Sequence, residues 1–228
     1  MTTASDPQFE RDGAVRIRSV LSEAEASSLA AELEPQITGR PGARLEVEPG
    51  VASLLAVDGA VGRIAAGFIG SAAMPVRVVL FDKSPDSNWL VAWHQDRTIA
   101  VRERHETPGF GPWSTKDGVL HVAPPITVLN GMVTLRLHLD PVDTSNAPLI
   151  VAAGSDRFGF VPADTAMDRA SSCGAVACEA QAGDVWAYST PILHMSARST
   201  GDQRRRVLQI DYAATALPEP LEWRGIGA

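Results

Sequence analysis

Apolar residues recur at helical spacing in two segments of the N-terminal third of the chain. The first begins at Ser22, which forms a capping box with Glu25 three residues later and predicts a helix that continues to about Leu33. In the second segment, apolar side chains between residues 57 and 69 fall at helical spacing, which predicts a further helix there. A short strand is expected before both helices, at residues 14–18.

From residue 76 onward the pattern changes to short apolar runs, several of them alternating, which are typical of β-strands. The predicted strands lie at residues 76–81, 90–96, 132–139, 149–152, 176–179, 185–188 and 205–213. Short strands after two helices, with turn signals between them, favour antiparallel sheets closed as a jelly roll. We therefore predict a mainly β protein, a double-stranded β-helix (jelly roll) with N-terminal helices packed on one sheet, as a single domain over residues 1–228.

Residues 105–125 interrupt the strands with a stretch rich in glycine, proline, polar and aromatic residues. A loop of about 20 residues inside a compact domain is usually either functional or disordered. Phe110 and Trp113 favour a lid that closes over a substrate and contacts it through these aromatic side chains. His105 is a further candidate for substrate contact, although a histidine on a surface loop is the commoner outcome.

The composition is ordinary for a globular protein and narrows the choice of partners. The 228 residues are 45% hydrophobic and 21% charged, and the net charge of -7 argues against nucleic acid as a partner. Two cysteines do not indicate a disulfide framework and suit a reducing cytoplasm. No signal peptide and no apolar run of roughly 18 residues is visible, so we expect a cytoplasmic protein without a membrane partner.

The candidate chemistry lies in the segment His94-Gln95-Asp96 and in the distant His194. A histidine and a carboxylate two residues apart on one strand point to the same face of a sheet. With a second imidazole they make the 2-His-1-carboxylate triad that holds non-haem iron(II) and leaves positions open for a co-substrate and dioxygen. The alternatives are a chance H-x-D sequence, which many proteins contain, and a core histidine at position 194.

A series of short motifs extends this pattern, in order, along nearly the whole chain from Phe9. The motifs lie at residues 81–85, 88–89, 93–96, 137–140, 146–149, 154–155, 182–184, 194–196 and 204–206. In these motifs the chain resembles the phytanoyl-CoA dioxygenase-like family of iron(II)/2-oxoglutarate-dependent oxygenases. Residues 146–149 and 154–156 depart from many relatives, but in a connecting turn, so the departure bears on loop shape and substrate and not on the chemistry.

The resemblance implies roles for individual residues. His94, Asp96 and His194 would bind Fe(II), and Arg205, eleven residues after His194, would bind the distal carboxylate of 2-oxoglutarate with its bidentate fork. Ser196 matches a family hydroxyl that contacts the co-substrate. Halogenating relatives replace the carboxylate ligand by alanine or glycine, so its presence here favours hydroxylation.

Strand alternation adds candidates near this site. It turns Arg205 toward the interior of the barrel and the arginines on either side of it toward solvent. Arg136 and His138 share one face of their strand. That face is either exposed to solvent or, as in relatives, turned to the cavity, where Arg136 would contact 2-oxoglutarate or an acidic substrate and His138 the substrate. Lys83 is a similar candidate for binding the co-substrate.

The resemblance therefore implies an Fe(II)/2-oxoglutarate-dependent dioxygenase that uses O2 to hydroxylate, or otherwise oxidise, a C–H bond of a small molecule, with release of succinate and CO2. Two other classes stay open. One is a cupin-type metal enzyme, which commonly holds its metal with three histidines and needs no buried arginine. The other is a non-catalytic jelly-roll protein that binds or senses a ligand. The sequence pattern names neither the substrate nor the oligomeric state, because function depends on the site and not on the fold.

Overall fold

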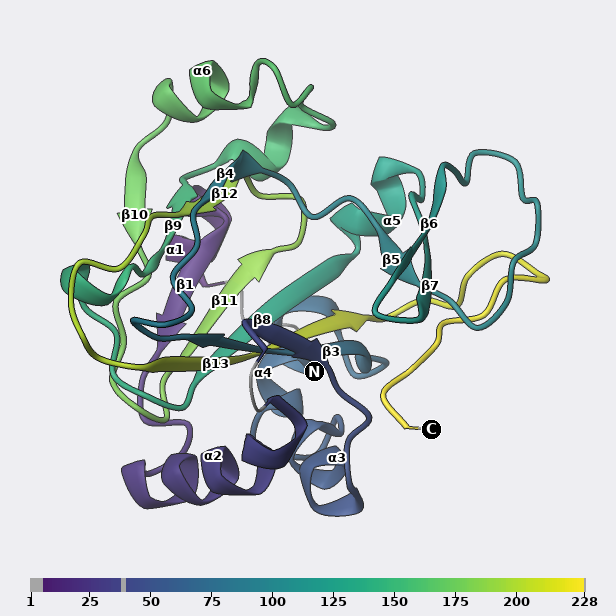
Figure 1. Ribbon diagram of the computed structural model, residues 1–228. Helices are drawn as coiled ribbons and strands as arrows, with labels where there is room; N and C mark the ends of the chain where they lie inside the picture. The colour runs from purple at the N-terminus through teal and green to yellow at the C-terminus, as the bar shows by residue number, and fades with distance from the viewer. Residues whose placement is uncertain (1–5, 38–39, 228) are drawn as a thin grey trace.

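The computed structural model describes residues 6–37 and 40–227 and shows two facing antiparallel sheets with a small third sheet beside them (Figure 1). The strand order of the larger sheet is β1-β11-β8-β13-β3-β2, and that of the second sheet is β10-β9-β12-β4. Strands that are distant in sequence are neighbours in both sheets. The predicted mainly β jelly roll is confirmed.

The strands are short in the second sheet and longer in the first. The larger sheet contains β1 (Ala14–Ile17), β2 (Gly42–Arg44), β3 (Met74–Lys83), β8 (Met132–His138), β11 (Val185–Ser189) and β13 (Arg205–Ala213). The second sheet contains β4 (Val91–His94), β9 (Leu149–Ala152), β10 (Ala175–Ala177) and β12 (His194–Ser196). The third contains β5 (Ile99–Ala100), β6 (Trp113–Lys116) and β7 (Val119–Val122).

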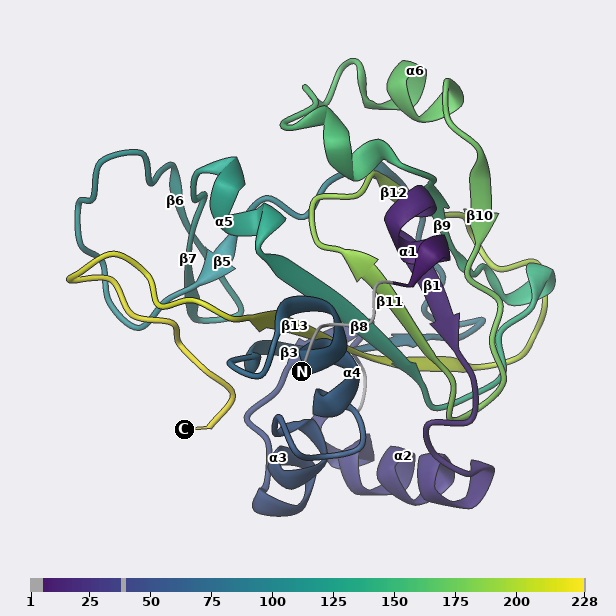
Figure 2. The ribbon, with the colours of Figure 1, turned by 180° about the vertical axis from the view of Figure 1, so that it is seen from behind.

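Helices α2, α3 and α4 gather on one face of the larger sheet, opposite the second sheet (Figures 1 and 2). The helices are α1 (Pro7–Asp12), α2 (Glu23–Ile37), α3 (Pro49–Leu55), α4 (Gly62–Ile69), α5 (Ile126–Asn130) and α6 (Ala166–Ser171), with 3-10 turns at Thr144–Asn146 and Ser155–Phe158. Apolar side chains fill the space between these helices and the sheet, and the largest include Leu33, Leu55, Leu80, Leu135 and Ile210. None of the helices in the described ranges is long and apolar enough to cross a membrane.

The capping box predicted for α2 forms. The Ser22 N–H donates to Glu25 Oε2 at 2.7 Å, and the Glu25 N–H donates to Ser22 Oγ at 3.2 Å. The helix continues to Ile37, beyond the predicted end near residue 33, although Pro35 lies inside it. Leu33 and Ile37 lie about one turn apart and are both buried, so packing against the sheet stabilises this extra turn.

The helix predicted over residues 57–69 is wrong in its first part. α3 ends at Leu55 and α4 begins only at Gly62, with a turn between them. A Cβ atom at Gly62 would lie 1.9 Å from the Ala56 carbonyl oxygen. Glycine therefore permits a tight return of the chain that apolar periodicity does not reveal.

Residues 105–125 contain a β-hairpin where the sequence suggested a loop. Strands β6 and β7 pair over four residues each and form the third sheet with β5, to one side of the main sheets (Figure 1). Phe110 and Trp113 pack against an apolar cluster that includes Val122 and Trp223. These aromatic side chains therefore anchor the hairpin to the rest of the domain.

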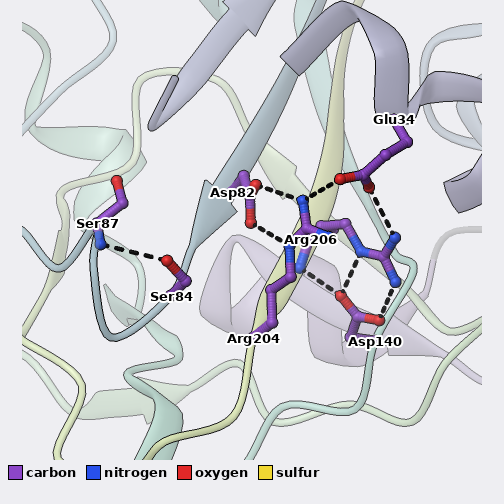
Figure 3. A network of polar contacts seen from close by, with 7 residues as sticks. All are labelled: Glu34, Asp82, Ser84, Ser87, Asp140, Arg204 and Arg206. Carbon is purple, nitrogen blue, oxygen red and sulfur yellow. Dashed lines mark hydrogen bonds and ion pairs between the residues drawn. The ribbon is translucent and has the colours of Figure 1, made fainter. Parts of the chain in front are cut away.

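Arg206 of β13 and Arg204, directly before that strand, lie on the helix-covered side of the larger sheet and connect α2 to it (Figure 3). Arg204 pairs with Asp82 at 2.6 Å and with Glu34 at 2.7 Å. Arg206 pairs with Asp140 at 2.7 Å and with Glu34 at 3.2 Å. Both arginines point away from the barrel interior, as strand alternation predicts, but carboxylates and not solvent alone surround them.

Replacing Arg206 by methionine should lower the free energy of unfolding by about 1–3 kcal/mol, because it removes charge-assisted hydrogen bonds to Asp140 and leaves that half-buried carboxylate without them. Urea denaturation measures the change. The matched control is Arg102→Met, whose ion pair with Glu222 is exposed and should contribute less than about 0.5 kcal/mol. Equal losses in the two variants would contradict a stabilising role for the network.

Candidate metal centre

A cavity of about 370 Å³ lies between the two facing sheets. Alternate residues of β3 and β13 line it from the larger sheet, among them Val79, Phe81 and Gln209. Strands β4, β9 and β12 close it from the second sheet, where Val91 and Leu149 are lining residues. The cavity therefore occupies the barrel interior, on the face of the larger sheet that the helices do not cover.

His94, Asp96 and His194 come together at this cavity. His94 ends β4, His194 begins β12, and the two residues lie directly opposite each other in the antiparallel register. Their ring centroids are 4.2 Å apart. One ligand atom from each of the three residues lies within 4.8 Å of the others, so a single metal ion can contact all three.

Backbone carbonyl groups orient both imidazole rings. His94 Nδ1 lies 2.8 Å from the Ala92 carbonyl oxygen, and His194 Nδ1 lies 3.0 Å from that of Ile192. A carbonyl oxygen only accepts, so each Nδ1 carries a proton and each Nε2 presents a lone pair. Burial lowers the pKa of His194 to about 4, which keeps the ring in the neutral form that binds a metal.

Two donors orient the Asp96 carboxylate through the same oxygen. Arg77 Nη2 lies 3.4 Å and Gln209 Nε2 lies 3.2 Å from Asp96 Oδ2. Burial alone would raise the pKa of Asp96, but Arg77 and the two histidines outweigh it and hold the pKa well below its ordinary value. The carboxylate is ionised, and its other oxygen makes no hydrogen bond to a described residue, which leaves that oxygen for a metal.

Other buried side chains hold Arg77 and Gln209, the two donors to Asp96, in position. Gln209 Oε1 accepts from Arg136 Nη1 at 2.7 Å. A guanidinium can only donate, so this contact identifies the oxygen end of the amide and directs Gln209 Nε2 to Asp96. Arg77 Nε donates to Asp211 at 2.6 Å. A buried network therefore sets the direction of the carboxylate ligand.

Gln95 links the two chain segments that carry the ligands. β4 ends before it, so the carboxylate ligand lies beyond the strand on which the same-face prediction placed it. The Gln95 side chain donates to the carbonyl oxygens of Gly159 and Pro191, both at 2.8 Å, and accepts from the Val161 N–H at 2.9 Å. Pro191 lies three residues before His194, so one amide holds both segments in place.

Lys83, Arg136 and Arg205 form a buried cation cluster next to the ligands. Among residues 6–37 and 40–227, no carboxylate forms an ion pair with any of the three. Lys83 and Arg205 donate to backbone carbonyl oxygens, and Arg136 donates to the Gln209 amide. Burial, together with Arg205 and Arg136, lowers the pKa of Lys83 to about 8. Burial and Arg136 also lower the pKa of Arg205.

Several polar atoms in and beside this cluster have no hydrogen-bond partner among residues 6–37 and 40–227. They are Nε of Arg136, Nε of Arg205 and both ring nitrogens of His138, which follows Arg136 on β8 but does not line the cavity. Burial, followed by Arg136 and Arg205, lowers the pKa of His138 well below its ordinary value, so this ring is neutral. Unpaired buried donors and mutually repelling cations are both relieved by a bound anion. The cation cluster is therefore suited to an anionic ligand.

The structure brings most of the predicted site residues to one place. The cavity is lined by His94, Asp96, Arg136, His194, Ser196 and Arg205. Lys83 Nζ lies 3.4 Å from Ser196 Oγ. Three predicted substrate-contact residues do not line the cavity. Phe110 and Trp113 pack against their apolar cluster. His105 lies at the surface, with its Nε2 atom 3.6 Å from Glu103 Oε2.

Other lining residues were not singled out from the sequence. They include the charged residues Arg44, Arg77, Lys116 and Asp117. Strand alternation could have identified Arg77, because it lies two and four residues before Val79 and Phe81 and therefore on the same, cavity-lining face of β3. A signal also existed for Asp117, since Asp-Gly between two strands is a hairpin signal. Arg44 belongs to a three-residue strand with no periodicity to read.

The sequence matches one family model. The model described as phytanoyl-CoA dioxygenase (PhyH) matches residues 9–207. No curated protein matches the chain in sequence.

Solved structures share the fold over almost the whole chain. EctD from S. alaskensis, in its apoform, is 18% identical with a TM-score of 0.70, covering 97% of this chain and 83% of that one. SnoK, a non-heme alpha ketoglutarate dependent carbocyclase from nogalamycin biosynthesis, is 18% identical with a TM-score of 0.67, covering 97% and 85%. HygX from Streptomyces hygroscopicus, with nickel and 2-oxoglutarate bound, is 17% identical with a TM-score of 0.62, covering 98% and 95%. At these identities the likeness shows the fold.

Asp96→Ala should weaken the binding of Fe(II), or of Ni(II) as its redox-stable substitute, by at least about tenfold, because the only charged ligand of the triad is lost. Isothermal titration under anaerobic conditions measures the affinity, and circular dichroism checks that the fold is kept. Asp117→Ala is the matched control, since this carboxylate also lines the cavity but lies outside the triad. Wild-type affinity in Asp96→Ala would remove Asp96 from the metal site.

Proposed function

The chain belongs to the phytanoyl-CoA dioxygenase family, and on that premise we propose that it hydroxylates a C–H bond of a small molecule. Membership makes it a non-haem iron(II)/2-oxoglutarate-dependent oxygenase. Iron, 2-oxoglutarate and O2 together supply the oxidation of the C–H bond when they are bound, with release of succinate and CO2. In this proposal His94, Asp96 and His194 are the iron ligands.

The assignment of the site rests on one observation: the three candidate metal ligands lie beside a buried cation cluster with which no carboxylate of the described residues forms an ion pair. 2-Oxoglutarate is a dianion that chelates a metal at one end and leaves a free carboxylate at the other. Arg205 offers a guanidinium with its Nε unpaired, and Lys83 and Ser196 lie next to it. A carboxylate here would supply the missing hydrogen-bond partner and reduce the repulsion between the cations, so the residues fit this co-substrate.

Hydroxylation is the outcome that the retained carboxylate ligand favours. Asp96 occupies the position that halogenating relatives leave open, and Arg77 and Gln209 hold it in one direction. Similar structures are described as a carbocyclase and an epimerase, so the fold accommodates other oxidations as well. Mass spectrometry of the product decides between them, because only hydroxylation adds one oxygen atom to the substrate.

The two alternative classes have less support. A cupin-type enzyme with three histidine ligands would have no use for the cation cluster, and a non-catalytic binding protein would have no need of an open metal site. We also propose a small-molecule substrate, as in SnoN, whose structure contains nogalamycin RO. A cytoplasmic location suits Cys173 and Cys178, which are both free thiols.

The direct test of the proposed function is an anaerobic titration with Fe(II) and then 2-oxoglutarate. Bidentate chelation of a ferrous ion should produce a weak visible charge-transfer band near roughly 500 nm. Admission of O2 should then yield succinate. A protein that binds Fe(II) but gives neither band nor succinate would favour the alternative classes.

Arg205→Ala should raise the KM for 2-oxoglutarate by at least about tenfold, because a bidentate charge-assisted pair in a buried site is lost. Arg205→Lys should rescue only part of the loss, since a point charge replaces a fork. Arg204→Ala is the matched control, because Arg204 directly precedes β13 and its side chain points away from the cavity and pairs with Asp82. Wild-type KM in all three variants would point to a different co-substrate.

Binding of 2-oxoglutarate should take up a proton between about pH 8 and 9. Burial, Arg205, Arg136 and Arg198 together lower the pKa of Lys83 to about 8 in the free protein, and a carboxylate beside it would raise that pKa again. Above pH 8 the affinity should therefore decline as Lys83 loses its proton. Calorimetry in buffers of different ionisation enthalpy measures the uptake. Lys83→Met should lack it, and unchanged uptake in this variant would contradict the assignment.

A further inference from the structure

The turn between β6 and β7 places two charged residues on the cavity. Asp117 and Gly118, the two residues between the paired Lys116 and Val119, both have positive φ angles, 49° and 76°. Two such residues are typical of the tight type I′ hairpin turn, for which Asp-Gly is a preferred sequence. Lys116 and Asp117 both line the cavity.

Contacts on both sides fix this hairpin tip. Lys116 Nζ donates to Thr98 Oγ1 at 2.9 Å, in the segment that follows the metal-ligand Asp96. Asp117 forms an ion pair with Arg44 of β2, which also lines the cavity. At its far end the hairpin is anchored by Trp113 in the apolar cluster. These contacts hold the hairpin tip in a fixed position, where it forms part of the cavity lining.

The cavity carries an excess of positive charge. Among its described lining residues, five cations face two carboxylates, in a protein whose net charge is -7. Arg77 is paired with Asp211 and Asp96, and the free carboxylate of the co-substrate would supply one negative charge to Arg136 and Arg205 together. At the hairpin tip Arg44 is paired with Asp117, whereas the Thr98 hydroxyl is the only hydrogen-bond partner of the Lys116 ammonium in the described part of the chain.

Two observations indicate that Arg44 and Lys116 are suited to bind a ligand near the candidate metal site. Arg44 Nε is buried and has no hydrogen-bond partner. The pKa of Lys116 is lowered by burial and by Arg77, while Asp96 acts against this decrease, so Lys116 lies within electrostatic range of the metal carboxylate. A negatively charged group at this end of the cavity would satisfy both side chains.

We propose that the substrate is an anion, a small molecule whose carboxylate or phosphate group binds to Lys116 and Arg44. This inference rests on the proposed function, because it assumes that 2-oxoglutarate occupies the cation cluster. The apolar lining residues Trp89, Val91 and Met195 provide a surface for the carbon skeleton of such a molecule. The Lys116 ammonium would fix the anionic end and thereby select which C–H bond faces the metal.

The test uses the anaerobic wild-type protein with Fe(II) and saturating 2-oxoglutarate. Four probes of similar size are titrated: benzoate, phenyl phosphate, benzamide and benzylamine. At least one of the two anions should bind about tenfold more tightly than neutral benzamide, and benzylamine should bind least. The perturbation of the charge-transfer band reports binding next to the metal. Comparison of benzoate with phenyl phosphate separates a carboxylate site from a phosphate site.

Lys116→Met should remove most of the preference for the anion, reducing its affinity by about tenfold. Arg102→Met is the matched control, because it removes an exposed cation on the same side of the molecule but outside the cavity lining, and the affinity should stay unchanged.

Equal binding of benzamide, binding of none of the four probes, or wild-type affinity in Lys116→Met would each overturn the proposal. Failure of the proposed function gives a different result, since the charge-transfer band with 2-oxoglutarate would then not form in the wild-type protein at all.

Discussion

The two-residue period of the strands in the larger sheet separates two kinds of side chain, and the site depends on this separation. On β13, Leu208 and Ile210 point into the core beneath the helices, while Arg205 and Gln209 line the cavity. A slip of one residue in the pairing would exchange the two faces. It would place an arginine among leucines and deprive Asp96 of its amide donor. Apolar packing against α2, α3 and α4 therefore sets the register that brings the candidate metal ligands and their hydrogen-bond donors together.

The inner face of the sheet carries charges that burial disfavours. Arg77 lies between two carboxylates, Asp96 and Asp211, so its charge is compensated within the protein. No carboxylate in the described ranges pairs with the cation cluster, and unpaired buried charge destabilises a fold unless a ligand compensates it. Local departures from the rules of stable packing are expected at functional sites. Arg77, whose charge is compensated, orients the candidate ligand Asp96. The cation cluster, whose charge is not compensated, is suited to bind an anion.

Sequence reasoning succeeded where a residue's position follows from local periodicity or from a fixed order of motifs. The jelly roll, the capped helix at Ser22 and the inward direction of Arg205 are of this kind. It failed where the outcome depends on contacts between distant segments. The hydrogen bond between Gln95 and Gly159 forms only after folding. Trp113 was interpreted as part of a lid because the apolar cluster against which it packs includes residues far along the chain, such as Trp223. Composition alone does not distinguish an aromatic anchor from an aromatic contact with substrate.

The cavity has a buried charged end at the cation cluster and an exposed charged end at the hairpin tip, and this difference in burial changes how strongly each would bind an anion. Lys83 and Arg205 are almost completely buried, whereas Lys116 lies on the exposed hairpin tip. Charges in contact with solvent are screened over about 8 Å at physiological ionic strength, and buried charges are screened much less. An anion at the buried end is therefore bound strongly whatever the salt concentration. An anion at the exposed end gains less from charge and more from the fixed position of the Lys116 ammonium. In the proposed function, the buried end would provide affinity for the co-substrate, and the exposed end would select among substrates.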